Sequence, residues 1–287
     1  MRKEASSQFR ANELHEHWSR LHQTDREPWP EARAIGRLAK ERGPIAAAID
    51  AQGGAAAVAQ ALQDAWRAFH CGAFPRAVLA GEKLGALGAA VANKSVAVDS
   101  LYSNRSEAQL LKALESAIAR GEQALAELPD HPNTHYTLAL VMGRYSQRIS
   151  ILKALAAGLA GRVREHLERT LSLEPRHAEA HLALGLYHAE IIGKLGVLAA
   201  GLTYGATANA AVDHFRRALA LAPASPIVRM EYAHGLLLLD GTRHRAEAHA
   251  LYAQAAACEP ADAMERLDVA RAKRGLDGPG GGSSVEQ

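Results

Sequence analysis

Four prolines between residues 129 and 260 constrain the fold more than any other feature. They are separated by 46, 48 and 37 residues, and each follows a segment rich in helix-forming residues. Proline ends a helix because it lacks a backbone N–H and disfavours helical geometry in the residue before it. A recurring stop of this kind predicts an internal repeat whose units each end in a helix. The four are Pro129, Pro175, Pro223 and Pro260.

The residues before the last two prolines follow one pattern, A-x3-[FY]-x2-A-x4-P. Small residues let two helices approach closely, and the aromatic residue fills the groove between them. The pattern resembles the second helix of the tetratricopeptide repeat. It predicts an all-α fold, an α-solenoid of antiparallel helix pairs. The matching residues are Ala211, Phe215 and Ala218, and then Ala248, Tyr252 and Ala255.

Two units are longer than the usual repeat. Their extra residues lie near 145–161 and 191–208, between the first and the second helix. The two inserts resemble each other in sequence, Leu155-Ala-Ala-Gly-Leu159 against Leu198-Ala-Ala-Gly-Leu202. We therefore expect lengthened first helices with inserts that project from one side of the stack.

Three segments are predicted along the chain. Residues 1–54 are polar and form an N-terminal helical segment, with helices near 9–22 and 30–42 separated by Pro28-Trp29-Pro30. Residues 55–275 form the repeat domain. Residues 276–287 are glycine-rich, and a disordered tail is expected there.

Composition excludes several classes of function. The net charge is +2 with no block of basic residues, so nucleic acid is not expected as a partner. Cys71 and Cys258 form no C-x-x-C motif and are typical of a reducing compartment. The N-terminus has no apolar run of the secretory type. We expect a cytoplasmic protein.

Residues 130–240 resemble the tetratricopeptide-like domain of the regulator of microtubule dynamics family and its bacterial relatives. The resemblance rests on Gly143-Arg-Tyr-Ser-Gln-Arg-Ile-Ser150, Arg164-Glu-His-Leu-Glu-Arg169, Ala183-Leu-Gly-Leu-Tyr187, and the long insert before Ala211-Val-Asp-His-Phe215. The resemblance implies a helical repeat domain that serves interaction. Tubulin binding is not carried over, and the Ala/Arg-rich composition is typical of a bacterial chain.

Histidine pairs recur in two adjacent units at a spacing of four residues, which suits zinc ligation on a helix. Packing or exposed polar roles are the preferred interpretation, since a repeat also copies residues for structural reasons. A metal protein or an enzyme that uses these histidines therefore stays an alternative, although no metal or cofactor is expected. The pairs are His131 with His135 and His177 with His181.

No catalytic motif is present. The sequence lacks G-x-S-x-G, a P-loop and H-E-x-x-H. Carboxylates such as Glu165 and Glu168 stand at spacings typical of solvated helix faces. We expect no enzymatic activity.

The second insert raises the question of a membrane. Residues 191–212 carry a single charge, Lys194, but also many Gly, Thr and Asn residues. A membrane-spanning helix needs about 20 predominantly apolar residues. No integral membrane segment is predicted, and peripheral membrane contact through the Gly/Ala-rich inserts stays an alternative function.

The concave surface of stacked first helices is the predicted site. Such surfaces bind extended peptides or helices of partner proteins. We expect a scaffold that binds a protein or peptide there, with the aromatic and arginine side chains as its anchors. The same leucines could instead be core. The predicted groove residues are Tyr136, Leu140, Arg144, Leu182, Leu186, Glu190, Met230 and His234.

Overall fold

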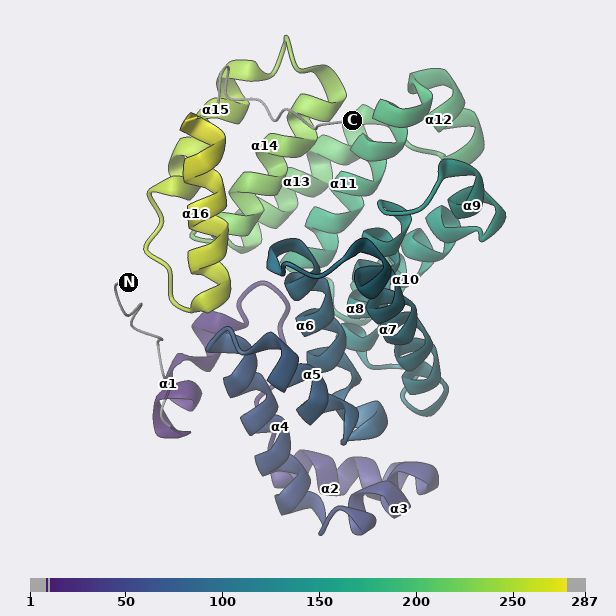
Figure 1. Cartoon of the computed structure of the whole chain (residues 1–287), viewed down its shortest axis with the longest axis vertical. Coiled ribbons are helices and arrows are strands. Elements are labelled where there is room, and N and C mark those ends of the chain that lie inside the picture. The colour runs from purple at the N-terminus through teal and green to yellow at the C-terminus, as the bar shows by residue number, and fades with distance from the viewer. Residues whose placement is uncertain (1–8, 10, 278–287) are drawn as a thin grey trace. The chain divides into compact units, whose positions relative to one another are not determined.

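The protein is helical throughout the part of the chain that its structure, a computed structural model, describes, which is residue 9 and residues 11–277. This part contains sixteen α-helices, one 3₁₀ helix and no strand (Figure 1). The predicted all-α fold is confirmed. Most helices follow one another as antiparallel pairs, as a tetratricopeptide-like solenoid requires.

The chain forms two compact units. The first contains residues 1–19 and 27–174, and the second contains residues 20–26 and 175–287. The seven residues 20–26 are thus separated from the rest of the second unit by almost the whole of the first unit in sequence.

The first unit contains three helix pairs of the repeat type, α4 with α5, α6 with α7, and α8 with α10. Two shorter helices, α2 and α3, precede them. The helices are α1 (Ala11–Leu21, which continues into the second unit), α2 (Ala32–Glu41), α3 (Gly43–Ala51), α4 (Ala55–His70), α5 (Phe74–Glu82), η1 (Gly85–Gly88), α6 (Ala89–Tyr102), α7 (Glu107–Glu127), α8 (Pro132–Ser146), α9 (Ile151–Ala156) and α10 (Leu159–Leu173).

The second unit contains two pairs, α11 with α13 and α14 with α15, and α16 packs on the second pair. The helices are α11 (Ala178–Leu195), α12 (Val197–Tyr204), α13 (Ala208–Leu221), α14 (Pro226–Asp240), α15 (Arg245–Ala256) and α16 (Ala263–Asp277).

Local signals account for these boundaries. Each of the four prolines that mark the repeat stands two to four residues beyond the end of a second helix, as predicted. They are Pro129, Pro175, Pro223 and Pro260. Pro132 and Pro226 open first helices at a position where a missing N–H has no cost. Gly53 and Gly54 have φ of 89° and 90°, which favours glycine, and they form the turn between α3 and α4.

Phe215 lies at the centre of the core of the second unit. It is fully buried, and its ring stacks on Tyr232 with 5.0 Å between centroids. Alanines from α11, α13, α14 and α15 surround it, as the small-residue pattern predicted. Tyr252 differs from Phe215. It is only partly buried, beside Gly275 of α16, because it stands in the last pair and a single helix covers it.

The two inserts form short helices, α9 and α12, each between the first and the second helix of its pair. The first helix α11 is lengthened to 18 residues, as expected, whereas α8 has 15.

The N-terminal segment brings together an unusual share of the aromatic residues. All three Trp lie in one cluster with Phe9, Phe69 and Phe74. Trp18 and Trp66 are buried, and the indole N–H of Trp18 donates to the carbonyl of Glu27 at 2.8 Å. The predicted helices near 9–22 and 30–42 are present as α1 and α2. At the other end α16 includes the first two residues of the predicted tail, and residues 278–287 lie outside the described residues.

Candidate partner-binding site

The predicted groove residues of the first unit lie along α8, and they differ in exposure. Tyr136 is 5% exposed, and the ammonium of Lys94 lies 6.0 Å from the centre of its ring. Leu140 is half-buried against the core. Tyr136 therefore supports the inner wall of this face, while Leu140 can be reached from solvent.

Arg144 is half-buried at the last turn of α8 and has unused donors. Its Nη1 lies 3.4 Å from Oε1 of Gln147, which is a long contact. Its Nε is buried and has no hydrogen-bond partner among the described residues. A guanidinium has five N–H donors, so Arg144 retains the capacity to bind a carboxylate.

The predicted residues of the second unit lie on α11 and α14. Leu182 and Met230 are 5% and 1% exposed and belong to the core. Leu186, Glu190 and His234 are half-exposed. Three of the eight predicted residues are thus interior, and five remain accessible.

Charged groups surround His234 on this face. Its Nδ1 lies 3.4 Å from Oε2 of Glu231, and Arg271 donates to Oε1 of the same carboxylate at 3.1 Å. Glu231 raises the pKa of His234, and burial opposes this only in part. Glu190 accepts from Lys194 at 3.4 Å. The face therefore offers apolar leucines among paired charges.

The first histidine of each predicted pair caps a helix. Nδ1 of His131 accepts from the backbone N–H of Thr134 at 3.2 Å, and Nδ1 of His177 accepts from Ala180 at 3.0 Å. Each therefore serves as the N-cap of a first helix, in place of the usual Ser, Thr, Asp or Asn.

The second histidine of each pair joins the two helices of one repeat. Nε2 of His135 lies 2.8 Å from the carbonyl oxygen of Pro129, and its Nδ1 lies 3.0 Å from Nδ1 of His166. A carbonyl only accepts, so neutral His135 carries its proton on Nε2, and its Nδ1 accepts from Nδ1–H of His166. His181, Pro175 and His214 repeat this arrangement at 3.2 Å and 3.0 Å.

Burial lowers the pKa of the linking histidines His135, His166 and His181, which keeps them in the neutral form that these bonds need. Within the described residues, no group of three or more His, Cys, Asp and Glu side chains is placed to hold a metal ion. The repeated histidines therefore act as caps and links in this structure.

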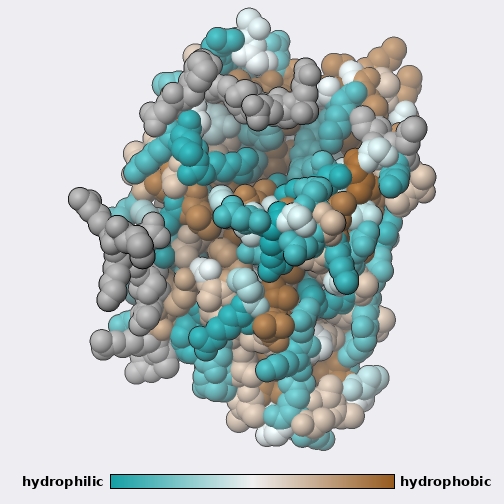
Figure 2. Space-filling view, in the orientation of Figure 1, coloured by the Kyte–Doolittle hydropathy of each residue, from teal (hydrophilic) through white to brown (hydrophobic). Residues whose placement is uncertain are grey.

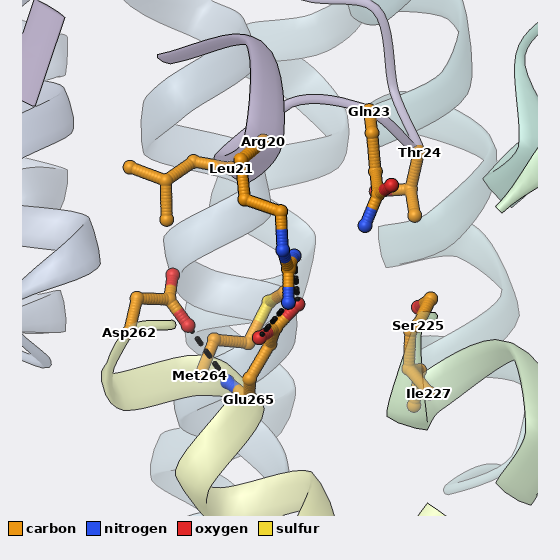
Figure 3. A pocket seen from close by; sticks show the side chains of 9 residues that line it. All are labelled: Arg20, Leu21, Gln23, Thr24, Ser225, Ile227, Asp262, Met264 and Glu265. Atoms are coloured by element: carbon orange, nitrogen blue, oxygen red, sulfur yellow. Dashed lines mark hydrogen bonds and ion pairs between the residues drawn. The ribbon is translucent and has the colours of Figure 1, made fainter. Parts of the chain in front are cut away.

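A site that sequence reasoning missed lies in the second unit, where residues 20–26 meet the starts of α14 and α16 (Figure 3) and, through Thr24, the start of α11. Arg20 donates twice to Glu265, at 2.7 and 2.9 Å. Thr24 donates to Oε1 of Glu179 at 2.5 Å, and its carbonyl accepts from the N–H of Glu179 at 3.1 Å.

Part of this site is visible in the sequence. Asp262-x-x-Glu265 has the spacing of a helix-capping pair, and Oδ1 of Asp262 does accept from the N–H of Glu265 at 2.8 Å. The spacing predicts the start of a helix. It does not indicate that a segment 245 residues away in sequence binds there.

The insert helix α12 exposes apolar side chains. Val197, Leu198 and Leu202 are 69%, 77% and 82% exposed, and Leu195 beside them is 37% exposed. Figure 2 shows this apolar surface at the upper right, over the position of α12 in Figure 1. Ala200 of the same helix is buried and packs on Ile192 and Ala206.

A match to one protein family shows to which family this chain is related. The model of the family described as Regulator of microtubule dynamics protein 1-3 matches residues 90–273. The chain belongs to this family. The matched region contains the inserts, the histidine links and all eight predicted groove residues, so the resemblance read from the sequence is confirmed. Among curated proteins there is no match.

A solved structure gives independent support for the fold of this family member. The crystal structure of a thermophilic TPR protein of Thermus thermophilus is similar, with a TM-score of 0.54 and 18% sequence identity. The similarity covers 76% of this chain and 99% of the other, and it shows the tetratricopeptide-like fold.

The described residues contain no single helix that is long and apolar enough to cross a membrane. The bent pair α3 and α4, with 80° between its helices, reaches the necessary length and apolar composition only when its two helices are taken together.

Proposed function

We propose that this protein is a non-catalytic scaffold that binds a protein or peptide through the accessible residues of its first helices. These are Leu140 and Arg144 in the first unit, and Leu186, Glu190 and His234 in the second. The two units present them separately, and Tyr136, Leu182 and Met230 support them from within.

The observation that carries the proposal is Arg144. Arginine is among the commonest energetic anchors of interfaces, and this one is held by packing at its Nε while its remaining donors have only one long contact. Leu140, one helical turn earlier, supplies apolar area beside it. A partner segment with a carboxylate next to an apolar side chain fits this pair.

The proposal places the scaffold in the cytoplasm, whose reducing conditions suit the free thiols of Cys71 and Cys258. It assigns no enzymatic role. The tetratricopeptide-like fold supports a protein partner, and the identity of that partner is the object of the experiment.

The test is affinity capture from a bacterial lysate, read by quantitative mass spectrometry, with single charge reversals in the full chain. Arg144→Glu and Glu190→Arg should each reduce capture of at least one specific partner tenfold or more. Arg37→Glu, an exposed arginine on α2, is the matched control and should retain every partner. If folded Arg144→Glu and Glu190→Arg both retrieve everything that wild type retrieves, the proposed face is wrong.

A second candidate function rests on α12. Three strongly exposed apolar side chains on one short helix are unusual for a soluble surface and suit shallow insertion into a membrane interface. Full burial of each contributes roughly 1.5–3 kcal/mol, so the three would give weak and reversible attachment.

Vesicle flotation tests this candidate, with phosphatidylcholine vesicles that contain or lack phosphatidylserine. Leu198→Glu with Leu202→Glu should abolish flotation. Leu79→Glu, at a leucine on α5 that is 61% exposed, is the control and should not. Wild type that stays with the soluble fraction on both vesicle types would eliminate the candidate.

A further inference from the structure

Residues 20–26 lie in the second unit in the manner of a bound peptide. Their contacts include backbone and side-chain hydrogen bonds at Thr24 and a bidentate ion pair at Arg20. The receiving residues come from separate helices, Glu179 near the start of α11 and Glu265 near the start of α16. Figure 3 shows the contact of Arg20 with Glu265. The segment is therefore held at two residues, Arg20 and Thr24, which are four positions apart in the sequence.

The carboxylate of Glu265 is held in place by residues at the start of its own helix. Oε2 of Glu265 accepts from the N–H of Ala261 at 2.7 Å, and Asp262 caps the same turn. These bonds do not involve residues 20–26, so the geometry of Glu265 does not depend on Arg20. A fixed carboxylate whose side chain is only 10% exposed favours a ligand with a positive charge, because a buried charge without a counter-ion is costly.

Thr24 meets a similar arrangement at α11. Glu179 is buried, and it offers both a carboxylate acceptor and a backbone N–H donor to the same residue of the peptide. One residue satisfies both groups of Glu179 when its side-chain hydroxyl donates to the carboxylate and its backbone carbonyl accepts from the N–H. Ser and Thr are the residues that supply this hydroxyl at the required reach.

The fit of residues 20–26 is uneven. His22, Thr24 and Asp25 are buried, and Nδ1 of His22 lies 2.8 Å from Oδ1 of Asp25 within the segment, whereas other parts of the segment are less well held. The Arg20 side chain is 36% exposed, so its ion pair is partly solvated and of modest strength. Nε2 of Gln23 is buried in the pocket and has no hydrogen-bond partner among the described residues. Arg26 has φ of 57°, a left-handed conformation that is uncommon for a residue other than glycine.

We propose that the starts of α11, α14 and α16 form a peptide-binding site for partner segments with arginine and, four residues later, serine or threonine, and that residues 20–26 occupy it as a built-in competitor. The site shares no residue with the proposed partner-binding residues Leu140, Arg144, Leu186, Glu190 and His234, so it adds to the scaffold function and does not depend on it.

The test uses the full chain and a fluorescent peptide with the sequence of residues 19–27. In the double variant Arg20→Ala with Thr24→Val the resident segment is weakened, and the free peptide should bind at least tenfold more tightly than it binds wild type. Adding Glu265→Gln to the double variant should weaken binding of the free peptide tenfold or more relative to the double variant. A peptide with alanine in place of its arginine is the matched control and should not bind.

Binding is read by fluorescence anisotropy, and folding by far-ultraviolet circular dichroism. Equal affinity for wild type and double variant, or no binding to a double variant with native helix content, would overturn the proposal. If the double variant loses helix, Arg20→Lys replaces it, because lysine keeps the charge but loses the bidentate contact. The peptide must then bind Arg20→Lys more tightly than wild type, and adding Glu265→Gln must weaken that binding. Any other order of affinities would overturn the proposal.

Discussion

Phe215 fills the space that a side chain at Gly185 would need. A Cβ added to Gly185 on α11 would lie 2.5 Å from ring carbons Cδ1 and Cε1 of Phe215, and a Cβ at Gly235 on α14 would also overlap the ring. Phe215 is fully buried, so the ring cannot move toward solvent. The aromatic residue of the repeat and the small residues of the two flanking first helices therefore form one unit of packing.

The first prediction follows from this contact. Gly185→Ala should lower the free energy of unfolding by roughly 1–3 kcal/mol, the usual cost of overpacking a core. Gly143→Ala is the control, because nothing lies within 4 Å of its added Cβ, and alanine in a helix should raise stability by up to about 1 kcal/mol. Urea titration measures both. In a Phe215→Leu background the Gly185→Ala penalty should largely disappear, and strictly additive costs would contradict the contact.

The second prediction concerns the two aromatic residues at equivalent repeat positions. Phe215→Ala should cost about 3–5 kcal/mol, as for other fully buried rings. Tyr252→Ala should cost clearly less, because Tyr252 is only partly buried beside α16. Thermal and denaturant unfolding of the two variants provide the comparison. Equal losses would show that the last helix pair is packed as tightly as the pair before it.

The third prediction concerns the docking of the N-terminal helix. Trp18→Phe removes the N–H that donates to the carbonyl of Glu27, and it should cost roughly 1–3 kcal/mol through the unsatisfied carbonyl. Trp29→Phe is matched in size and removes an indole that makes no hydrogen bond in the described structure. The near-ultraviolet circular dichroism of the tryptophan cluster should weaken more for Trp18→Phe. An equal effect of both variants would contradict the assigned role of the Trp18 N–H.

Periodic local signals explain why the sequence predicts the repeats so well. Pro129, Pro175, Pro223 and Pro260 act on their own neighbours, so their effect on helix ends is visible without any tertiary contact. The same holds for the inserts, which are visible as extra length. The sequence does not show in the same way which residues of a helix face are buried. Tyr136 and Arg144 share a face by spacing, yet one is buried and the other accessible, because neighbours such as Lys94 decide the exposure of each.

Contacts between distant segments are beyond the reach of sequence reasoning for a physical reason. Arg20 and Glu265 are ordinary charged residues in helices, and such residues are mostly solvated. Only the placement of Asp262 and Ala261 around Glu265, together with the path of residues 20–26, makes them a pair. The histidine roles are partly visible, since the four-residue spacing recurs, but the partners His166 and His214 come from the second helix of each pair, beyond the insert.

The last prediction is that stability falls in mild acid through the histidine caps and links. Burial, with a smaller contribution from His135, lowers the pKa of His131 to about 4, so the folded chain resists a proton that the unfolded chain accepts near pH 6.5. The contribution of His131 to the free energy of unfolding is complete above pH 6.5 and is lost as the pH falls toward 4. It amounts to about 3 kcal/mol, and the lowered pKa values of His135, His166 and His181 act in the same direction.

The chemistry of the cap explains the sign. Nδ1 of His131 accepts from the N–H of Thr134, and a protonated imidazole cannot accept at that nitrogen. His234 acts in the opposite direction, because Glu231 raises its pKa. Its contribution is complete below pH 6.5 and is lost as the pH rises through the raised value.

A substitution at the cap separates His131 from the other histidines. His131→Asn keeps a capping acceptor and removes the titration, so it should reduce the slope of unfolding free energy between pH 6.5 and 4 by up to one proton, about 1.4 kcal/mol per pH unit. Denaturant titrations at a series of pH values measure the slope. A slope that His131→Asn does not alter would show that the ring is protonated in the folded chain and that the cap is made in another way.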